Sequence, residues 1–358
     1  MKKLDLYILR KFLTTYLFTV MVLIAVLIVI DLTEKIENFR RPELTVWRIV
    51  TEYYLNFIPY LAVLLSPLMI FIAAVFVTSQ LATHTEIVAM LSSGMSLGRI
   101  MRPYLMGACI VGLFIFWLMG WAIPMSSKVR HNFEDNFVRD KFYFTQRNFH
   151  MKLAPDLYAY LESYDNISHV GYRFSLEQIV GLELTKKLEA SRISWDSTKR
   201  KWTLYQFKVR VLEKGKEKIN YFTQQDTLLS MAPKDFESKH NYWERLTIPE
   251  LDRYINELKM RGSDGIERYL VEKYERIAYP VCVLILTAIG ITVSSRKSRG
   301  GSGFQIALGF VLAFVYIFFV FISRGFAQTG DINPMLAVWL PNIVFCLLGI
   351  FMYYRVPK

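Results

Sequence analysis

Long apolar runs that are almost free of charge alternate with polar connections along much of this chain. Six runs are long enough to cross a membrane, because a hydrocarbon core about 30 Å thick needs about 20 helical residues. The predicted membrane helices cover residues 12–31, 57–80, 103–125, 274–294, 304–324 and 335–354. The pattern therefore predicts a membrane α-helical fold with three helices on either side of a long insertion.

The insertion has a different pattern. Segments such as DLYAYLESY, RISWDSTKRKWTLYQFKVRVL and KINYFTQQDTLLSM alternate apolar and polar positions and are rich in β-branched and aromatic residues. Separated by turn clusters such as DSTKRK and EKGKEK, they predict antiparallel strands in a sandwich or an open barrel. The segment TIPELDRYINELKMRG, with Thr247 as N-cap and Gly262 at its end, predicts an amphipathic helix that returns the chain to the membrane.

Charge predicts the orientation of these helices. Cations in the short flanks fall on one side of the membrane if both termini are cytoplasmic, whereas the opposite short loops mix fewer cations with Glu34, Glu37, Glu43 and Glu52. The chain is thus predicted to hold helices one to three and a short cytoplasmic helix in residues 1–125, an extracytoplasmic domain in 126–270 and helices four to six in 271–358. The cations in question are Lys2, Lys3, Arg10, Lys11, Arg99, Arg102, Arg296, Lys297, Arg299, Arg355 and Lys358.

Composition supports membrane embedding and removes several other classes. The net charge of +12 does not favour nucleic-acid binding, because the basic residues sit at the ends of apolar runs rather than in one patch. Cys109, Cys282 and Cys346 each lie within an apolar run, so we expect neither a disulfide framework nor a zinc site. The start, MKKLDLYILRKF, leads into an apolar run too long for the core of a signal peptide, which predicts a retained membrane helix.

Few residues suggest catalysis. Gly94 to Gly98 match the G-x-S-x-G pattern of serine hydrolases, but Ser96 follows a membrane run and lacks the strand-turn-helix context of a nucleophile elbow. The sequence has no G-x-x-x-x-G-K-[ST] phosphate loop and no H-E-x-x-H helix, so any ATP must be used by a partner and no bound cofactor or metal is expected. Acidic residues are missing from the interiors of the predicted helices, which argues against ion coupling.

The segment TEIVAMLSSGMS, between the second and third membrane helices, has apolar positions at helical spacing. Glu86 is the only acid on its surface, among Ser, Thr and small residues. Small residues permit close approach of another protein, and one carboxylate is suited to pair with a partner's arginine. The alternative is a helix that lies on lipid headgroups with Glu86 solvated.

This segment resembles the lipopolysaccharide export permease family, of the LptF/LptG (YjgP/YjgQ) type, in which a similar sequence forms a coupling helix. The resemblance extends to LDLYILRKFLTTY, FIPYLAVLLSPL, VEKYERIAYPVCVLIL and NPMLAVWLPNIVFCLLGIFM, and so to nearly the whole chain. The sequences of the first helix and of the EIVAMLSSG segment favour the G-type over the F-type subunit. The resemblance places the coupling helix at 84–98, gives Glu86 the role of the coupling glutamate and implies a periplasmic β-jellyroll-like domain.

The resemblance also implies partners. They are an LptF-like or LptG-like sister permease, an LptB-like cytoplasmic ATPase dimer that hydrolyses ATP, and periplasmic LptC-like and LptA-like β-jellyroll proteins. The chain would then be an inner-membrane subunit of an ATP-binding-cassette exporter, in contact with membrane lipid, which extracts lipopolysaccharide from the outer leaflet.

Candidate lipid-binding residues are basic groups near the outer ends of the first and third helices. These are Lys35, Arg40, Arg41, Lys128 and Arg130, which either pair with lipid phosphates or snorkel to the membrane interface. Two other functions share the same features: a permease for another envelope glycolipid, and a non-transporting membrane scaffold whose β-domain binds a periplasmic partner.

Overall fold

A computed structural model describes residues 3–139, 147–181, 183–213, 216–236, 241–261, 265–295 and 301–355. The chain forms two compact units, which we treat separately. The helical unit comprises Met1–Arg139, Trp243–Leu251 and Glu267–Lys358, and the β unit comprises Asp140–Tyr242 and Asp252–Ile266. Lys2, Arg296, Lys297, Arg299 and Lys358, which contributed to the charge argument, lie outside the described residues.

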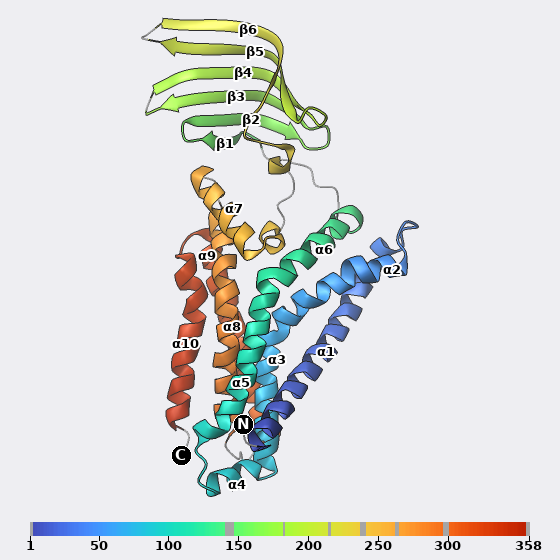
Figure 1. The fold of residues 1–358 in the computed structure, drawn as a ribbon, viewed down its shortest axis with the longest axis vertical. Helices are drawn as coiled ribbons and strands as arrows, with labels where there is room; N and C mark the ends of the chain where they lie inside the picture. The colour runs from blue at the N-terminus through green and yellow to red at the C-terminus, as the bar shows by residue number, and fades with distance from the viewer. Residues whose placement is uncertain are drawn as a thin grey trace. The chain divides into compact units, whose positions relative to one another are not determined.

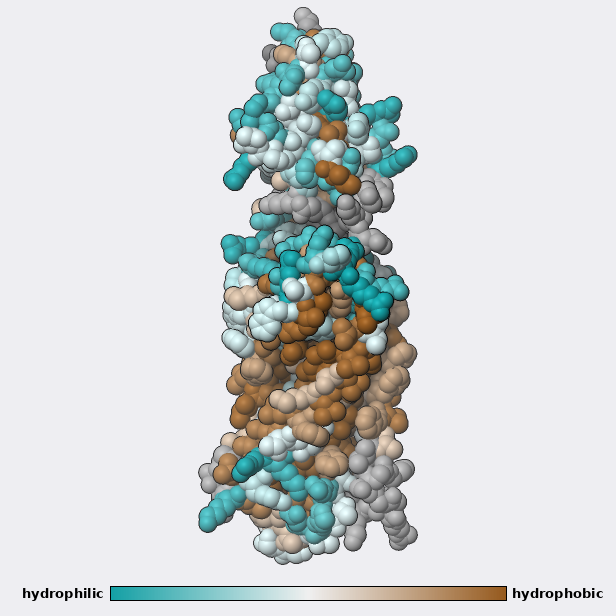
Figure 2. Space-filling view, turned by 90° about the vertical axis from the view of Figure 1, so that its right-hand side faces the viewer, coloured by the Kyte–Doolittle hydropathy of each residue, from teal (hydrophilic) through white to brown (hydrophobic). Residues whose placement is uncertain are grey.

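The helices confirm the six predicted membrane spans (Figure 1). The first three are α1 (Lys3–Phe39), α2 (Val46–Arg48) continuing into α3 (Leu55–Thr83), and α5 (Leu97–Trp117) continuing into α6 (Ile123–Phe137). The last three are α8 (Ile266–Ser294), α9 (Gly301–Thr329) and α10 (Pro334–Arg355), and the shorter helices are α4 (Glu86–Ser92) and α7 (Ile248–Arg261). On the face in Figure 2, the helical unit carries a broad hydrophobic band with hydrophilic side chains at both ends.

Several of these helices extend beyond the apolar runs that predicted them. Their polar ends carry opposite charges four residues apart, as in Asp31 with Lys35 and Arg130 with Glu134, a spacing that stabilises a helix outside the hydrocarbon core. Two junctions are π-helical turns, at Ile49–Tyr54 and Leu118–Ala122. The second precedes Pro124, which has no N–H to continue the normal hydrogen-bond ladder.

Packing separates central from peripheral helices. In the most apolar stretch of α3, 67% of residues are buried within the unit, against 11% for α1 and 22% each for α9 and α10. Central contacts are close: a Cβ on Gly290 of α8 would lie 3.1 Å from the Ala74 Cβ and 3.2 Å from the Phe71 carbonyl oxygen of α3. Peripheral helices therefore present apolar surface to lipid or to another subunit.

The β unit is one antiparallel sheet of six strands in sequence order among the described residues. The strands are β1 (Phe149–Ala154), β2 (Leu157–Asp165), β3 (Val170–Val180), β4 (Glu183–Asp196), β5 (Lys201–Glu213) and β6 (Lys216–Thr227). The inserted antiparallel β-domain is confirmed. Its described strands pair with their chain neighbours through short turns, without the crossovers of a jelly roll, so the topology is a simple meander.

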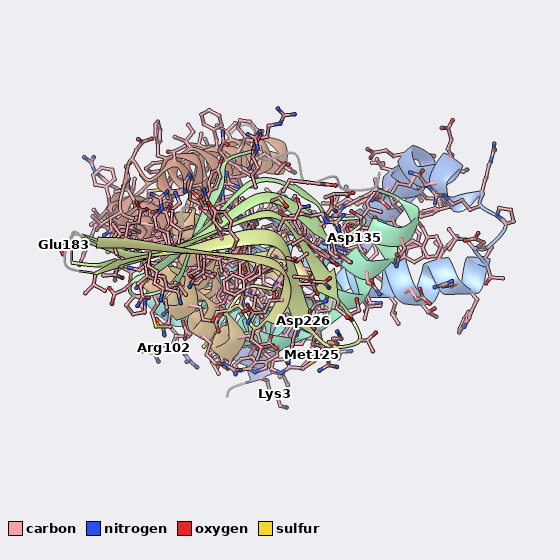
Figure 3. The ribbon with its side chains drawn as sticks, turned by 90° about the horizontal axis from the view of Figure 1, so that it is seen from above. Lys3, Arg102, Met125, Asp135, Glu183 and Asp226 are labelled. Carbon is pink, nitrogen blue, oxygen red and sulfur yellow. The ribbon has the colours of Figure 1, made fainter. Side chains whose placement is uncertain are left out.

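The sheet departs from strict period-two alternation at its middle. Two rows of buried residues cross β2 to β5, and they are separated by three positions on each strand rather than two. Arg173 and Gln206, between the rows, have φ values of 50° and 46°, in the left-handed region. Figure 3 shows the strands bending between the labelled Glu183 and Asp226. The rows are Leu161, Phe174, Ala190 and Phe207, and Tyr164, Gly171, Ile193 and Leu204.

Helix α7 begins as predicted at Thr247, whose backbone N–H donates to the Glu250 Oε2 atom over 2.9 Å. The Thr247 hydroxyl donates to the same oxygen, so that Glu250 closes the first turn of the helix. The Thr247 backbone hydrogen bond lowers the pKa of the Glu250 carboxyl, and Lys128 contributes to the same effect. Gly262, the predicted end of the helix, lies outside the described residues.

Candidate functional site

The helical unit places candidate residues at both of its ends. At the end that also holds the start of α1 and the end of α10, the chain between α3 and α5 forms α4 (Figure 1). Ile87 and Met90 are buried and anchor α4, while Val88, Ala89 and Ser92 are exposed. Glu86 is the first residue of α4 and is partly exposed. A surface formed by one valine and small residues, with one carboxylate at its edge, is therefore available to another protein.

The Gly94 to Gly98 pattern has a structural role. Gly94 has φ +85°, which ends the turn after α4, and the Ser96 hydroxyl accepts a hydrogen bond from the Arg99 backbone N–H over 3.3 Å as the N-cap of α5. The Arg99 guanidinium donates to the Asp5 carboxylate over 2.8 Å, which fixes the start of α1 beside the start of α5. Ser96 therefore caps the start of α5, the helix that follows α4.

The opposite end of the unit holds Lys35. Its ammonium donates to the Asp31 Oδ1 atom over 2.6 Å and to the Tyr53 hydroxyl, and lies 4.8 Å from the centre of the Tyr53 ring. Tyr53 in turn donates to Asp31 over 3.1 Å. Tyr53 comes from the π-helical turn Ile49–Tyr54 of the second membrane span, and Phe57 comes from α3 just after it. The Phe57 ring centre lies 5.9 Å from the Lys35 ammonium.

Arg130 of α6 approaches the same aromatic group. Only 5% of it is exposed, and its guanidinium carbon lies 4.9 Å from the Phe57 ring centre and 5.0 Å from that of Tyr60. Lys35 and Arg130, 95 positions apart in the numbering, therefore share Phe57. We call Lys35, Arg130, Asp31, Tyr53, Phe57 and Tyr60 the cation-aromatic site.

A buried ionic network supports Arg130. Its guanidinium lies 3.2 Å from the Glu244 carboxylate and 3.4 Å from that of Glu134. His131 lies between the same two acids, with ring nitrogens 3.1 Å from Glu134 and 3.2 Å from Glu244. The Nε atom faces Glu134 in the ion pair, whereas Nη1 is buried without a hydrogen-bond partner among the described residues. The cation is thus held in place and retains donor capacity for an anion.

The structure separates the other candidates from this site. Lys128 pairs with Glu250 over 3.1 Å at an exposed position, away from the aromatic group. Arg40 and Arg41 are exposed in the connection after α1, and within the described residues neither forms an ion pair. Of the five basic candidates, Lys35 and Arg130 are the two that the fold brings together on common aromatic residues.

Sequence reasoning missed another ion pair, which is partly buried. Glu275 near the start of α8 lies 3.3 Å from Arg324 near the end of α9, and Tyr60, Tyr279 and this pair line a cavity of about 100 Å³. Glu275 is the second residue of the predicted fourth span and Arg324 is the last residue of the predicted fifth, so the pair lies at the span ends and not in their interiors. The sequence does contain a signal for this pair. Consecutive membrane helices run antiparallel, so an acid at the start of the fourth span and a base at the end of the fifth lie at the same depth.

The lipopolysaccharide export system permease LptF/LptG family model matches residues 6–355, which include all six spans, α4 and the β unit. The chain belongs to this family. Permease protein LptG of the lipopolysaccharide export system of Haemophilus influenzae is 21% identical over 352 residues, which is 96% of each chain. An LptF/LptG permease is a transport protein, and this agrees with the structural role of Ser96 and with a subunit that is not an enzyme.

Proposed function

We propose that this chain is the permease subunit of an ATP-binding-cassette exporter that extracts lipopolysaccharide from the outer leaflet of the inner membrane. The observation that carries the proposal is the cation-aromatic site in a chain of the LptF/LptG family. Its two cations, one of which has a buried Nη1 donor without a hydrogen-bond partner, suit the phosphates of a lipid headgroup. The mostly exposed apolar stretches of α1 and α9 suit acyl chains and a sister permease subunit.

The energy source in this proposal is a partner. We infer that an LptB-like ATPase dimer docks on the α4 end, with Glu86 paired to one of its cations, and that both termini are cytoplasmic. Support comes from the exposed small residues of α4 and from the absence of a phosphate loop in the sequence. The lipid would leave on the other side, through the β unit, to LptC-like and LptA-like proteins.

The coupling role is tested with Glu86→Gln in the full chain expressed with its operon partners. We expect normal amounts of the variant in the membrane but less copurified ATPase and slower ATP-dependent lipid release, because the amide cannot form an ion pair. Glu43→Gln, which removes an exposed acid after α1, is the control. Unchanged ATPase recovery and transport in Glu86→Gln would contradict the role of Glu86.

The lipid role is tested by mass spectrometry of lipids that copurify with the wild type and with Lys35→Gln. Lys35 is partly exposed, so the neutral variant should fold and retain less lipopolysaccharide. Lys128→Gln is the matched control, because Lys128 lies outside the cation-aromatic site. Recovery of a different glycolipid would favour the permease of the same architecture with another substrate, and recovery of neither lipid nor ATPase would favour the membrane scaffold.

A further inference from the structure

One face of the β sheet is covered by the protein's own side chains, whereas the other holds a cavity. On the apolar face, Trp202, Ile193 and Phe236 are each 0% exposed. The chain after β6 covers this face: the Trp202 indole donates to the Met231 carbonyl over 2.9 Å, and Phe236 stacks on Tyr164 with ring centres 4.0 Å apart. This part of the apolar face is filled by the protein's own side chains.

A cavity of about 960 Å³ lies along the polar side of the same sheet. We call it the polar groove. Tyr158 and Tyr160 line it from β2, and Tyr221 lines it from β6. Tyr221 is 76% exposed, so its ring is accessible from solvent. Ser191 and Gln206, at the bend of the sheet, add a hydroxyl and an amide to the lining.

A chain of ion pairs crosses the strands between these aromatic borders. Lys187 lies 2.9 Å from Glu177 and 3.2 Å from Glu189, and Glu189 lies 2.6 Å from Lys208. The hydrogen bond from Lys208 lowers the pKa of the Glu189 carboxyl, and the hydrogen bond to Glu177 raises the pKa of Lys187, so Glu189 and Lys187 stay charged near neutral pH. Both signs alternate across the groove, which does not match a purely anionic or purely cationic ligand.

We propose that the polar groove binds an oligosaccharide. A sugar ring has an apolar C–H face that packs on a tyrosine ring and a rim of hydroxyls that both donate and accept hydrogen bonds. Carboxylates, ammonium groups and an amide in the groove offer both kinds of partner. The volume is at the upper end of the range of about 300–1,000 Å³ for ligand sites, and so favours several linked sugars over one.

This inference deepens the proposed function and rests on it in one respect: the ligand in the cell would be the sugar portion of the exported glycolipid. Acyl chains fit less well, because the face that would receive them is filled around Trp202 and the groove presents charges.

The test uses the full-length wild-type protein in lipid nanodiscs and two probes. One is fully deacylated lipopolysaccharide, an oligosaccharide without acyl chains, and the other is lipid A, which lacks the outer sugars. Isothermal titration should detect binding of the oligosaccharide, and the double variant Tyr158→Ala/Tyr221→Ala should lower its affinity about tenfold or more, as expected for two lost aromatic contacts. Tyr172→Ala is the control, because this tyrosine is 48% exposed on β3 but does not line the groove.

The possible outcomes are distinguishable. No binding of the deacylated probe to the wild type, or an equal loss in the control and the double variant, would overturn the inference even if intact lipopolysaccharide still copurifies. A double variant that loses lipid A but not the oligosaccharide would show an acyl-chain site and would also overturn it. Specific oligosaccharide binding by a protein that copurifies no lipopolysaccharide would support the groove and contradict the proposed function.

Discussion

At the scale of single residues, the helical unit holds charges where water is scarce. Arg130 and His131 are almost fully buried, and each is matched by the carboxylates of Glu134 and Glu244. A buried ion pair of this kind adds little net stability over a well-packed apolar pair, but removing one partner leaves the other charge buried and unpaired. The cation-aromatic site is therefore sensitive to changes that seem conservative in size.

We predict that Arg130→Met lowers the free energy of unfolding of the detergent-solubilised protein by about 3–5 kcal/mol, because Glu134 and Glu244 lose a cation in a buried setting. The measurement is the thermal midpoint followed by tryptophan fluorescence. Arg130→Met combined with Glu244→Met removes both charges of one pair and should recover part of the loss. A double variant less stable than Arg130→Met alone would contradict this explanation.

Glu250 gives a pH prediction outside the membrane spans. Its pKa is lower in the folded than in the unfolded protein, so its stabilisation is complete above the unfolded pKa of about 4.3 and is lost as pH falls through the folded value. Glu250→Gln keeps a capping oxygen but loses the charge. The variant should thus melt at lower temperature than the wild type at pH 7 and match it in acid, whereas Glu257→Gln, exposed on the same helix, should not change the profile.

Part of the candidate site was predictable at this scale and part was not. Lys35 and Arg130 were identified because basic residues stand out at the ends of apolar runs. Tyr53 was not, since its role depends on a π-helical turn that brings it between α1 and α6. Asp31 lies four positions before Lys35, a spacing that already indicates an ion pair on a helix.

At the scale of elements, the membrane helices followed directly from the hydrophobic pattern because length and apolarity alone decide whether a segment spans a bilayer. The sheet was harder. Period-two alternation predicted the strands, but the three-residue step between the buried rows depends on left-handed residues such as Arg173, a conformation that arginine does not signal in a sequence. Tertiary packing of the bent sheet, rather than local preference, selects that conformation.

Glycine contacts make helix packing testable. Gly290→Leu should separate α8 from α3, because even its Cβ would lie 3.1 Å from the Ala74 Cβ and 3.2 Å from a backbone oxygen. We expect a clear drop in thermal midpoint or in the amount of folded protein in the membrane. Gly325→Leu on α9 is the control, since a Cβ there meets nothing within 4 Å. Equal behaviour of the two variants would mean that the close α3–α8 approach does not limit stability.

At the scale of the whole molecule, the helical unit leaves much of its apolar surface uncovered by the chain itself. Only 11% of the most apolar stretch of α1 is buried within the chain. Its buried residues, among them Phe12, Tyr16 and Val20, recur every four positions and form a single stripe, so the rest of its circumference is left for lipid or a sister subunit. A permease that works with a second subunit is consistent with this division.

The orientation of the molecule gives the last prediction. Three spans separate the N-terminus from the β unit and two separate it from α4, so the β unit and α4 must lie on opposite sides of the membrane. In a background with Cys109, Cys282 and Cys346 replaced by alanine, Lys186→Cys on the exposed surface of β4 and Ser92→Cys on α4 report the two sides.

The charge bias of the short flanks predicts that the N-terminus lies in the cytoplasm. A maleimide that cannot cross the inner membrane should thus label Lys186→Cys in cells with a permeabilised outer membrane, and should label Ser92→Cys only after the inner membrane is opened. The reverse pattern would put α4 outside the cytoplasm, where no ATPase has access to Glu86, and would contradict the proposed coupling. Labelling at both positions in intact inner membranes would contradict the odd number of spans before the β unit.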